Sequence, residues 1–146
     1  PPLRTEEDRV SLIEGINKNL IDVIVSDHKP EDEESKRLTF SQAGTGASGI
    51  ETFLSLALEQ FHNGSIKLEK IIELITHNPA KILKIDKGNL SVGVNADFCI
   101  VDISKPWIVK KENLVSKSKN TSIEGRKLQG KVLSTFVKGQ ELYKIK

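Results

Sequence analysis

An acid and a histidine follow a short apolar stretch near the start of the chain. Residues 21–25 are mostly apolar and β-branched, and Asp27 and His28 come soon after, before Pro30. A carboxylate at the end of a strand can bind a metal ion or carry a proton, and an imidazole can do the same. An acid that simply stabilises a turn or caps a helix is an equally ordinary interpretation of Asp27. From these residues alone, both interpretations stay open.

The histidines do not form a metal-binding pattern. Neighbouring residues of a strand point in opposite directions, so His28 should face aside if Asp27 faces a site. We therefore expect His28 to be a hydrogen-bonded structural residue. His62 and His77 lie at predicted helix ends, and neither belongs to a His-x-His or His-x3-His pair. Structural roles are expected for both.

A long polar segment follows Asp27. Residues 26–48 contain an acidic run at 31–34 and a glycine-rich stretch that continues to Gly49. Loops of this length inside a compact domain are usually functional or disordered. The segment is therefore a candidate binding loop, with a flexible linker as the alternative.

Helical patterns surround this loop. Thr5 and the acids after it predict the start of a helix, with apolar residues at helical spacing up to Leu20. Further helices are predicted at residues 50–61, 68–76 and 78–83. A helix followed by a strand buried on both faces, here residues 21–25, is typical of an α/β barrel or a doubly wound fold.

Strands dominate the second part of the chain. They are predicted at residues 96–102, 107–109, 132–137 and 141–145, and Gly139 lies in a hairpin turn between the last two. We therefore divide the chain into an α/β part at residues 1–85 and a β-rich part at residues 86–146.

The overall composition indicates an ordinary globular protein. The 146 residues are 37% hydrophobic, and 22 basic and 20 acidic residues give a net charge of +2. Nothing in this balance indicates a nucleic-acid or membrane partner. Cys99 is the single cysteine, so an intrachain disulfide is impossible and a reducing, cytoplasmic location is expected. Because Cys99 lies in an apolar run, we expect it to be buried and inert.

Several stretches, taken in order, resemble the C-terminal part of a dihydroorotase of the amidohydrolase superfamily. They are Pro-Pro-Leu-Arg at residues 1–4, the strand that ends at Asp27 and His28, the glycine-rich stretch 43–52, the Asn-Pro-Ala helix within 74–83, the Gly-x-Leu to Ala-Asp pattern at 87–102, and the terminal stretch 116–143. The similarity covers essentially the whole chain. The pattern at 87–102 marks only the superfamily, whereas the spacing from Asp27 to Gly49 indicates dihydroorotase-like enzymes.

The resemblance implies a fold and a function. The fold would be the C-terminal portion of a TIM barrel, with the last strand, substrate loop and helices at residues 1–85, followed by a small β-rich accessory domain. The function would be zinc-dependent, reversible cyclisation of N-carbamoyl-L-aspartate to (S)-dihydroorotate in pyrimidine biosynthesis. Asp27, at the C-terminal end of a barrel strand, would be a zinc ligand and the proton carrier. Backbone groups of Ala43, Thr45 and Gly46 would hold the pyrimidine ring.

One position departs from the family pattern. The fourth residue after the catalytic Asp is usually a His that binds the substrate carboxylate, and here it is Glu31. An ionised Glu only accepts hydrogen bonds and repels a carboxylate. Three outcomes remain open: the role passes to Lys29, Lys36 or Arg37, the substrate preference differs, or the protein is weakly active.

Much of the superfamily's metal centre has no counterpart here. That centre needs a His-x-His pair, a bridging carboxylated Lys or acid and two further His, and a complete barrel takes about 250 residues. The chain opens at Pro1 without an initiator Met. We expect a fragment that alone binds no binuclear zinc centre and has no turnover. Its expected partners are the missing N-terminal part of the same enzyme, a small-molecule substrate and further copies in a homo-oligomer.

Other functions remain as alternatives. Within the enzyme class, an allantoinase or a dihydropyrimidinase would share most of these motifs. A non-catalytic dihydroorotase-like scaffold subunit, assembling with a partner such as aspartate transcarbamoylase, is the alternative from another class. A free-standing β-rich binding module is disfavoured, because residues 21–25 would then have no parallel neighbours to bury them.

Overall fold

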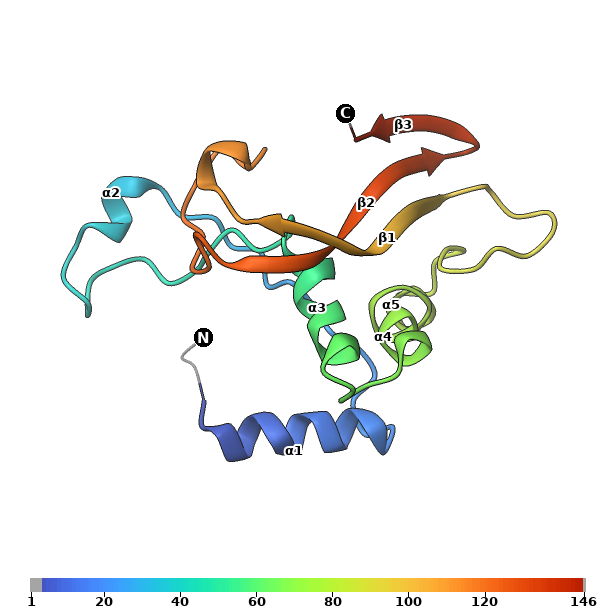
Figure 1. Ribbon diagram of the computed structural model, residues 1–146, viewed down its shortest axis with the longest axis horizontal. Coiled ribbons are helices and arrows are strands. Elements are labelled where there is room, and N and C mark those ends of the chain that lie inside the picture. The colour runs from blue at the N-terminus through green and yellow to red at the C-terminus, as the bar shows by residue number, and fades with distance from the viewer. Residues whose placement is uncertain (1–3, 146) are drawn as a thin grey trace.

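The computed structural model describes residues 4–145 as helices followed by a three-stranded antiparallel sheet (Figure 1). The elements are α1 (Glu6–Asn17), α2 (Glu33–Lys36), α3 (Phe53–His62), α4 (Leu68–Ile75), α5 (His77–Ile82), β1 (Phe98–Ile108), the 3-10 turn η1 (Lys111–Asn113), β2 (Lys127–Val137) and β3 (Gln140–Lys144). Residues 1–3, most of the Pro-Pro-Leu-Arg motif, lie outside the described residues. Across residues 4–145, no helix is both long and apolar enough to cross a membrane.

The predicted first helix is confirmed. Thr5 caps α1 through a reciprocal pair of bonds: its side chain accepts from the Asp8 N–H, and the Asp8 carboxylate accepts from the Thr5 N–H. This capping box satisfies N–H groups that have no partner inside the helix. Ile16 is the only buried residue of α1, so the helix touches the rest of the chain mainly near its C-terminal end.

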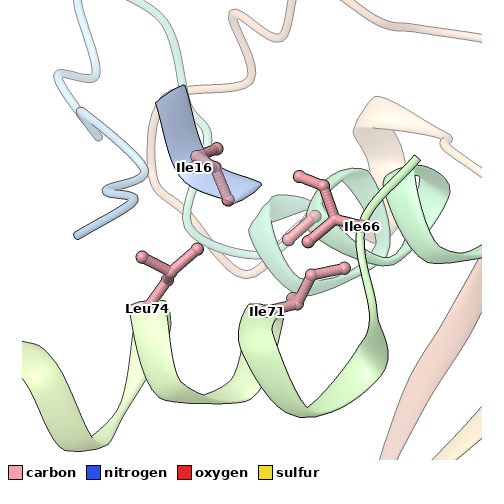
Figure 2. Packing of buried hydrophobic residues seen from close by; sticks show 5 residues of the cluster. Ile16, Ile66, Ile71 and Leu74 are labelled. Atoms are coloured by element: carbon pink, nitrogen blue, oxygen red, sulfur yellow. The ribbon is translucent and has the colours of Figure 1, made fainter. Parts of the chain in front are cut away.

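A small apolar core holds the helices together. Figure 2 shows Ile16 of α1 lying over Ile71 and Leu74 of α4, with Ile66 from the segment before α4 beside them. Ala57 of α3 completes the cluster. Ile71 and Leu74 are completely buried. The buried face of α4 therefore consists of Ile71 and Leu74, whereas another of its apolar residues, Ile72, is 41% exposed.

The sheet is a meander of two long strands and one short strand. The strands expected at residues 96–102 and 107–109 form one strand, β1, whose pairing with β2 shifts register between Asp102 and Pro106. The predicted hairpin joins β2 to β3. Its central residues, Lys138 and Gly139, have φ values of 50° and 78°. Positive φ at both positions matches the right-handed twist of paired strands.

Helix α3 packs directly on β2. Figure 1 shows α3 running from beneath the paired strands towards α1. The Ser55 hydroxyl donates to the Gly130 carbonyl at 2.6 Å, and the Trp107 indole N–H donates to the Ser55 oxygen at 3.1 Å. Leu58, fully buried, lies against Gly130, where a Cβ atom would come within 2.5 Å of its Cδ1. The missing side chain at Gly130 allows this close approach.

Two predictions about burial are wrong. Residues 21–25 are extended but form no strand, because no strand among residues 4–145 lies beside them to complete a ladder. The Ile24 N–H instead donates to the Leu74 carbonyl at 3.1 Å, and Val25 is 70% exposed. Cys99 is also exposed rather than buried. It lies on β1, which is an edge strand, and helix packing covers β2 instead.

The chain exposes more surface than a self-contained domain of its size. Its accessible area is 10639 Å² for 16.2 kDa, whereas a folded monomer of this mass exposes about 7,500 Å². Exposed apolar side chains include Leu20 and Val25, at each end of the unpaired extended segment. This surface resembles one that another polypeptide covers.

We expect the isolated chain to associate with itself. Residues 21–25 form no strand ladder within residues 4–145, and these ladder positions and the apolar side chains beside them favour contact with a second chain. Light scattering should give a mass above 16.2 kDa, and calorimetry a broad unfolding transition. Changing Leu20 and Val25 to Lys should move the mass towards the monomer. A monomer of the unchanged chain with one sharp transition would contradict this expectation.

Candidate functional site

Asp27 lies where the extended segment turns. Its φ is 44°, a left-handed conformation that few residues other than Gly adopt, and that Asp tolerates better than most. The side chain is exposed. Among residues 4–145 its carboxylate takes part in no hydrogen bond or ion pair, so it caps no helix here. The structure thus leaves this carboxylate available for chemistry.

His28 is a structural residue, as predicted. Its Nδ1 atom accepts hydrogen bonds from the N–H groups of Gly49 and Ile50, at 3.1 and 3.3 Å. Accepting both requires an unprotonated Nδ1, so the neutral ring carries its proton on Nε2. His28 therefore holds the end of the glycine-rich stretch, at Gly49 and Ile50, close to Asp27. His62 is also hydrogen-bonded, with its Nε2 2.9 Å from the Ile103 carbonyl oxygen.

Further bonds fold residues 26–48 back on themselves. The Lys29 N–H donates to the Ala47 carbonyl at 3.1 Å. The Lys36 ammonium donates to the carbonyls of Gly44 and Gly46, at 2.7 and 3.2 Å. Gly46 has a φ of 141°, and a Cβ atom there would overlap the Lys29 carbonyl. The segment is consequently an ordered loop, and its close backbone approach requires glycine.

Two of the predicted site residues, Glu31 and Thr45, are brought together in this loop by Lys29. The Lys29 ammonium lies 3.1 Å from the Glu31 carboxylate and 3.5 Å from the Thr45 hydroxyl. The Ala43 N–H donates to a carbonyl at the loop tip, while the N–H groups of Thr45 and Gly46 donate to no acceptor among residues 4–145. Lys29 therefore neutralises the residue that departs from the family pattern, and the loop presents two unused donors.

The other two candidate cations are occupied elsewhere. Lys36 binds the loop carbonyls described above, and the Arg37 guanidinium pairs with Glu33 and Glu34 on the exposed side of α2. Lys29 is thus the only one of the three whose ammonium lies beside both Glu31 and Thr45.

The sequence analysis missed a polar cluster beneath the loop. Ser48 is 7% exposed, and its hydroxyl donates to the Ser118 carbonyl at 3.0 Å and lies 3.3 Å from the Ser116 hydroxyl. Asn120 bonds both sides of the loop. Polar residues at alternate positions 116, 118 and 120, between lysines at 117 and 119, are the signal that could have indicated this cluster, and these three are the half-buried residues of the stretch.

A cleft of about 1040 Å³ lies between the two segments that this cluster joins. It is lined by residues 28, 30–33 and 36 on one side and by 111, 112 and 116–120 on the other. Acids predominate on the first side and lysines on the second. Glu31 and His28 line the cleft, whereas Asp27 does not, so the described residues do not enclose a complete site around Asp27.

A second cleft, of about 480 Å³, lies on the sheet and contains none of the predicted site residues. The Lys131 ammonium sits 3.6 Å above the Trp107 ring centre there. Burial lowers the pKa of Lys131, and the nearby Glu51 carboxylate partly opposes that shift. The Glu51 oxygens accept the N–H groups of Val115 and Ser116 at 2.9 Å each, so Glu51 holds the chain rather than a ligand.

The described residues do not by themselves fit a zinc centre. Within residues 4–145 there is no group of three or more His, Cys, Asp or Glu side chains that could hold a metal ion. Zinc sites in proteins take three or four protein ligands. Asp27 offers one carboxylate, and His28 uses its Nδ1 for the loop.

Comparisons with known proteins agree on one family. Residues 2–142 match the amidohydrolase family. The dihydroorotase of Wolbachia sp. subsp. Drosophila simulans (strain wRi) is 42% identical over 143 residues, which are 98% of this chain and 32% of the relative. The dihydroorotase of Aquifex aeolicus (strain VF5) is 44% identical over 144 residues, 99% of this chain and 34% of the relative. The chain thus spans about a third of the length of the curated relatives it matches.

Solved structures show the same relationship in three dimensions. The dihydropyrimidinase from Brevibacillus agri NCHU1002 matches with a TM-score of 0.91 at 23% identity, covering 99% of this chain and 33% of that one. The L-hydantoinase (dihydropyrimidinase) from Arthrobacter aurescens matches with a TM-score of 0.89 at 33% identity, with the same coverage. The arrangement of helices and antiparallel sheet therefore corresponds to one third of such proteins.

Proposed function

The chain belongs to the amidohydrolase family, and from that premise we propose that it is the C-terminal part of a dihydroorotase. The observation that carries the proposal is identity of about 42% to dihydroorotases along essentially the whole chain. The complete enzyme would interconvert N-carbamoyl-L-aspartate and (S)-dihydroorotate. This chain would contribute the substrate loop and one catalytic carboxylate.

The proposed architecture explains the unpaired segment. Residues 21–25 would be the last strand of a TIM barrel, with parallel neighbours supplied by the rest of the enzyme. Exposed Val25 and the excess accessible surface support this assignment. Residues 86–146 would be the β-rich accessory domain. Active sites of such barrels lie at the C-terminal ends of the strands, which is where Asp27 would lie if residues 21–25 form the last strand.

Asp27 would move the proton during hydrolysis. Its carboxylate would accept a proton from the attacking water and return it to the ring nitrogen that leaves. Zinc, bound by Asp27 together with ligands from the rest of the enzyme, would lower the pKa of that water. The free carboxylate of Asp27 and its place beside an anchored loop support this role.

The loop would hold the pyrimidine ring. The N–H groups of Thr45 and Gly46, which have no acceptor among residues 4–145, would donate to ring carbonyls. Ala43 would contribute its carbonyl, since its N–H is bound to Thr39 at 2.8 Å. Lys29, 3.1 Å from Glu31, would offset the repulsion between that acid and the substrate carboxylate at the position where the family usually has His.

Changing Lys29 to Met should weaken binding of substrates that carry a ring carboxylate. The complete enzyme should then show about a tenfold higher KM for dihydroorotate, because Glu31 becomes an unpaired acid facing an anion. Dihydrouracil, which lacks the carboxylate, should bind no worse. Lys67→Met, an exposed lysine outside the loop, is the matched control. Equal KM changes for both substrates would contradict the role given to Lys29.

One assay tests the proposed function as a whole. Dihydroorotate hydrolysis is measured with this chain alone and again with the N-terminal part of the enzyme added, with dihydrouracil and allantoin as competing substrates. We expect no turnover from the chain alone and preference for dihydroorotate in the complete enzyme. Preference for dihydrouracil or allantoin would indicate a dihydropyrimidinase or an allantoinase. No turnover of any substrate by the complete protein would indicate the non-catalytic scaffold, which the unusual Glu31 favours.

A further inference from the structure

One asparagine in the β-rich part bonds both sides of the candidate substrate loop. The Asn120 Nδ2 donates to the Gly46 carbonyl at 3.3 Å, and its Oδ1 accepts from the Glu31 N–H at 3.4 Å. The Asn120 backbone carbonyl accepts from the Ser48 N–H at 3.0 Å. Three points of the loop, before and after its tip, are thus held from a single residue.

The surroundings of Asn120 fix the side chain itself. The Ser118 hydroxyl donates to the Asn120 Oδ1 at 2.5 Å and approaches the Glu31 carbonyl, and the Ser48 hydroxyl lies 3.4 Å from the same Oδ1. Asn120 is partly buried and Ser48 almost fully buried. Because these bonds orient the amide plane, its donor faces Gly46 and its acceptor faces Glu31.

A second contact to Gly46 is much less restrictive. Lys36 also donates to the Gly46 carbonyl, at 3.2 Å, but its side chain is long, exposed and flexible. Gly46 has no Cβ to limit its own backbone rotation, and its φ is 141°. The short, oriented amide of Asn120 is therefore the contact that restricts the direction of the Gly46 peptide.

We infer that Asn120 is a positioning residue for the substrate loop, acting through the Gly46 carbonyl and the Glu31 N–H. This inference rests on the proposed function, since it assigns the β-rich part a role in the same site. Residues 116–120 of the β-rich part would then help to form the substrate-binding site, although none of their side chains need touch the substrate.

The test uses the complete enzyme and three variants. Asn120→Ala removes both side-chain contacts, whereas Asn120→Asp keeps the acceptor for the Glu31 N–H but loses the donor to the Gly46 carbonyl. The control is Asn113→Ala, which changes an exposed asparagine of η1 whose side chain has no hydrogen bond among residues 4–145. Asn120→Ala should raise the KM for dihydroorotate about tenfold and change kcat by less than about threefold. Asn120→Asp places an anionic oxygen against the Gly46 carbonyl and should raise KM at least as much, whereas Asn113→Ala should leave it unchanged.

Hydrogen exchange of the Glu31 amide gives a readout that needs no activity. Its exchange should accelerate in Asn120→Ala and remain slow in Asn120→Asp, while protection of β2 stays unchanged in both. A wild-type KM in either Asn120 variant, or loss of protection throughout β2, would overturn the inference. If the unaltered enzyme fails to hydrolyse dihydroorotate, the proposed function fails, and the Glu31 amide still reports whether Asn120 holds the loop.

Discussion

Changing Asp27 to Asn in the complete enzyme is expected to lower kcat for dihydroorotate hydrolysis by about 1,000-fold or more. An amide cannot accept a proton from water at neutral pH, so the proposed transfer to the leaving nitrogen would be lost. Asn has nearly the same size as Asp and also tolerates the left-handed conformation found here, a φ of 44°. The carboxylate has no hydrogen-bond partner among residues 4–145, so the change should cost little stability.

The control for this experiment is Asp22→Asn. Asp22 is another exposed acid in the same segment, and its side chain has no hydrogen-bond partner among residues 4–145, while its backbone carbonyl accepts from the Asn78 amide at 2.9 Å. Its substitution should leave kcat within about twofold of the original. Circular dichroism and hydrogen exchange check that both variants keep the fold. An Asp27→Asn enzyme with full kcat would remove Asp27 from the mechanism and with it the catalytic role proposed for this chain.

Local patterns predicted the hairpin and the helices other than the short α2 (Glu33–Lys36), which lies in the segment expected to be a loop, because the causes of these elements are local. The cap at Thr5 and the Lys138–Gly139 turn each depend on a few neighbouring residues, and both occur as expected. The structural role of His28 followed from strand geometry alone. Its hydrogen bonds to Gly49 and Ile50 confirm that role, although the extended segment before it lacks a ladder.

Features that depend on distant neighbours could not be predicted. Residues 21–25 have the composition of a buried strand, but a strand needs partners, and none is present among residues 4–145. Cys99 has apolar neighbours in the sequence, but it lies on β1, which is an edge strand. Its exposure therefore depends on the order of the strands in the sheet, which the local sequence does not specify. Asn120 meets Glu31 and Gly46 only because the chain returns past residue 110 to the loop.

The candidate site also combines features that the sequence indicated with features that only the folded chain shows. The resemblance to dihydroorotases indicated Asp27, Glu31 and the glycine-rich stretch as candidate site residues, and their roles stay predictions. It did not indicate which of the nearby cations pairs with Glu31, since Lys29, Lys36 and Arg37 are equally basic. Only the folded loop distinguishes them, by placing the Lys29 ammonium 3.1 Å from the Glu31 carboxylate.

Adding a side chain at Gly130 is expected to separate α3 from the sheet. In Gly130→Ala the new Cβ would lie 2.5 Å from the Leu58 Cδ1, and Leu58 is completely buried, so it has no space to move into. The backbone there also has a φ of 100°, which disfavours any residue with a Cβ. Crowding and backbone strain together should lower the free energy that is needed to open the contact between α3 and β2 by about 2–4 kcal/mol.

Gly93→Ala separates the two contributions. Gly93 has a nearly equal φ of 96°, but no atom lies within 4 Å of the position its Cβ would take. Its substitution should therefore cost only the backbone term, about 1 kcal/mol. Hydrogen exchange in the complete protein reports local opening, at the α3 and β2 amides for Gly130→Ala and at the amides around residue 93 for Gly93→Ala. Equal losses in the two variants would show that Leu58 yields to the new side chain, whereas a larger loss at Gly130 would show that close packing of α3 on β2 holds the helical and β-rich parts together.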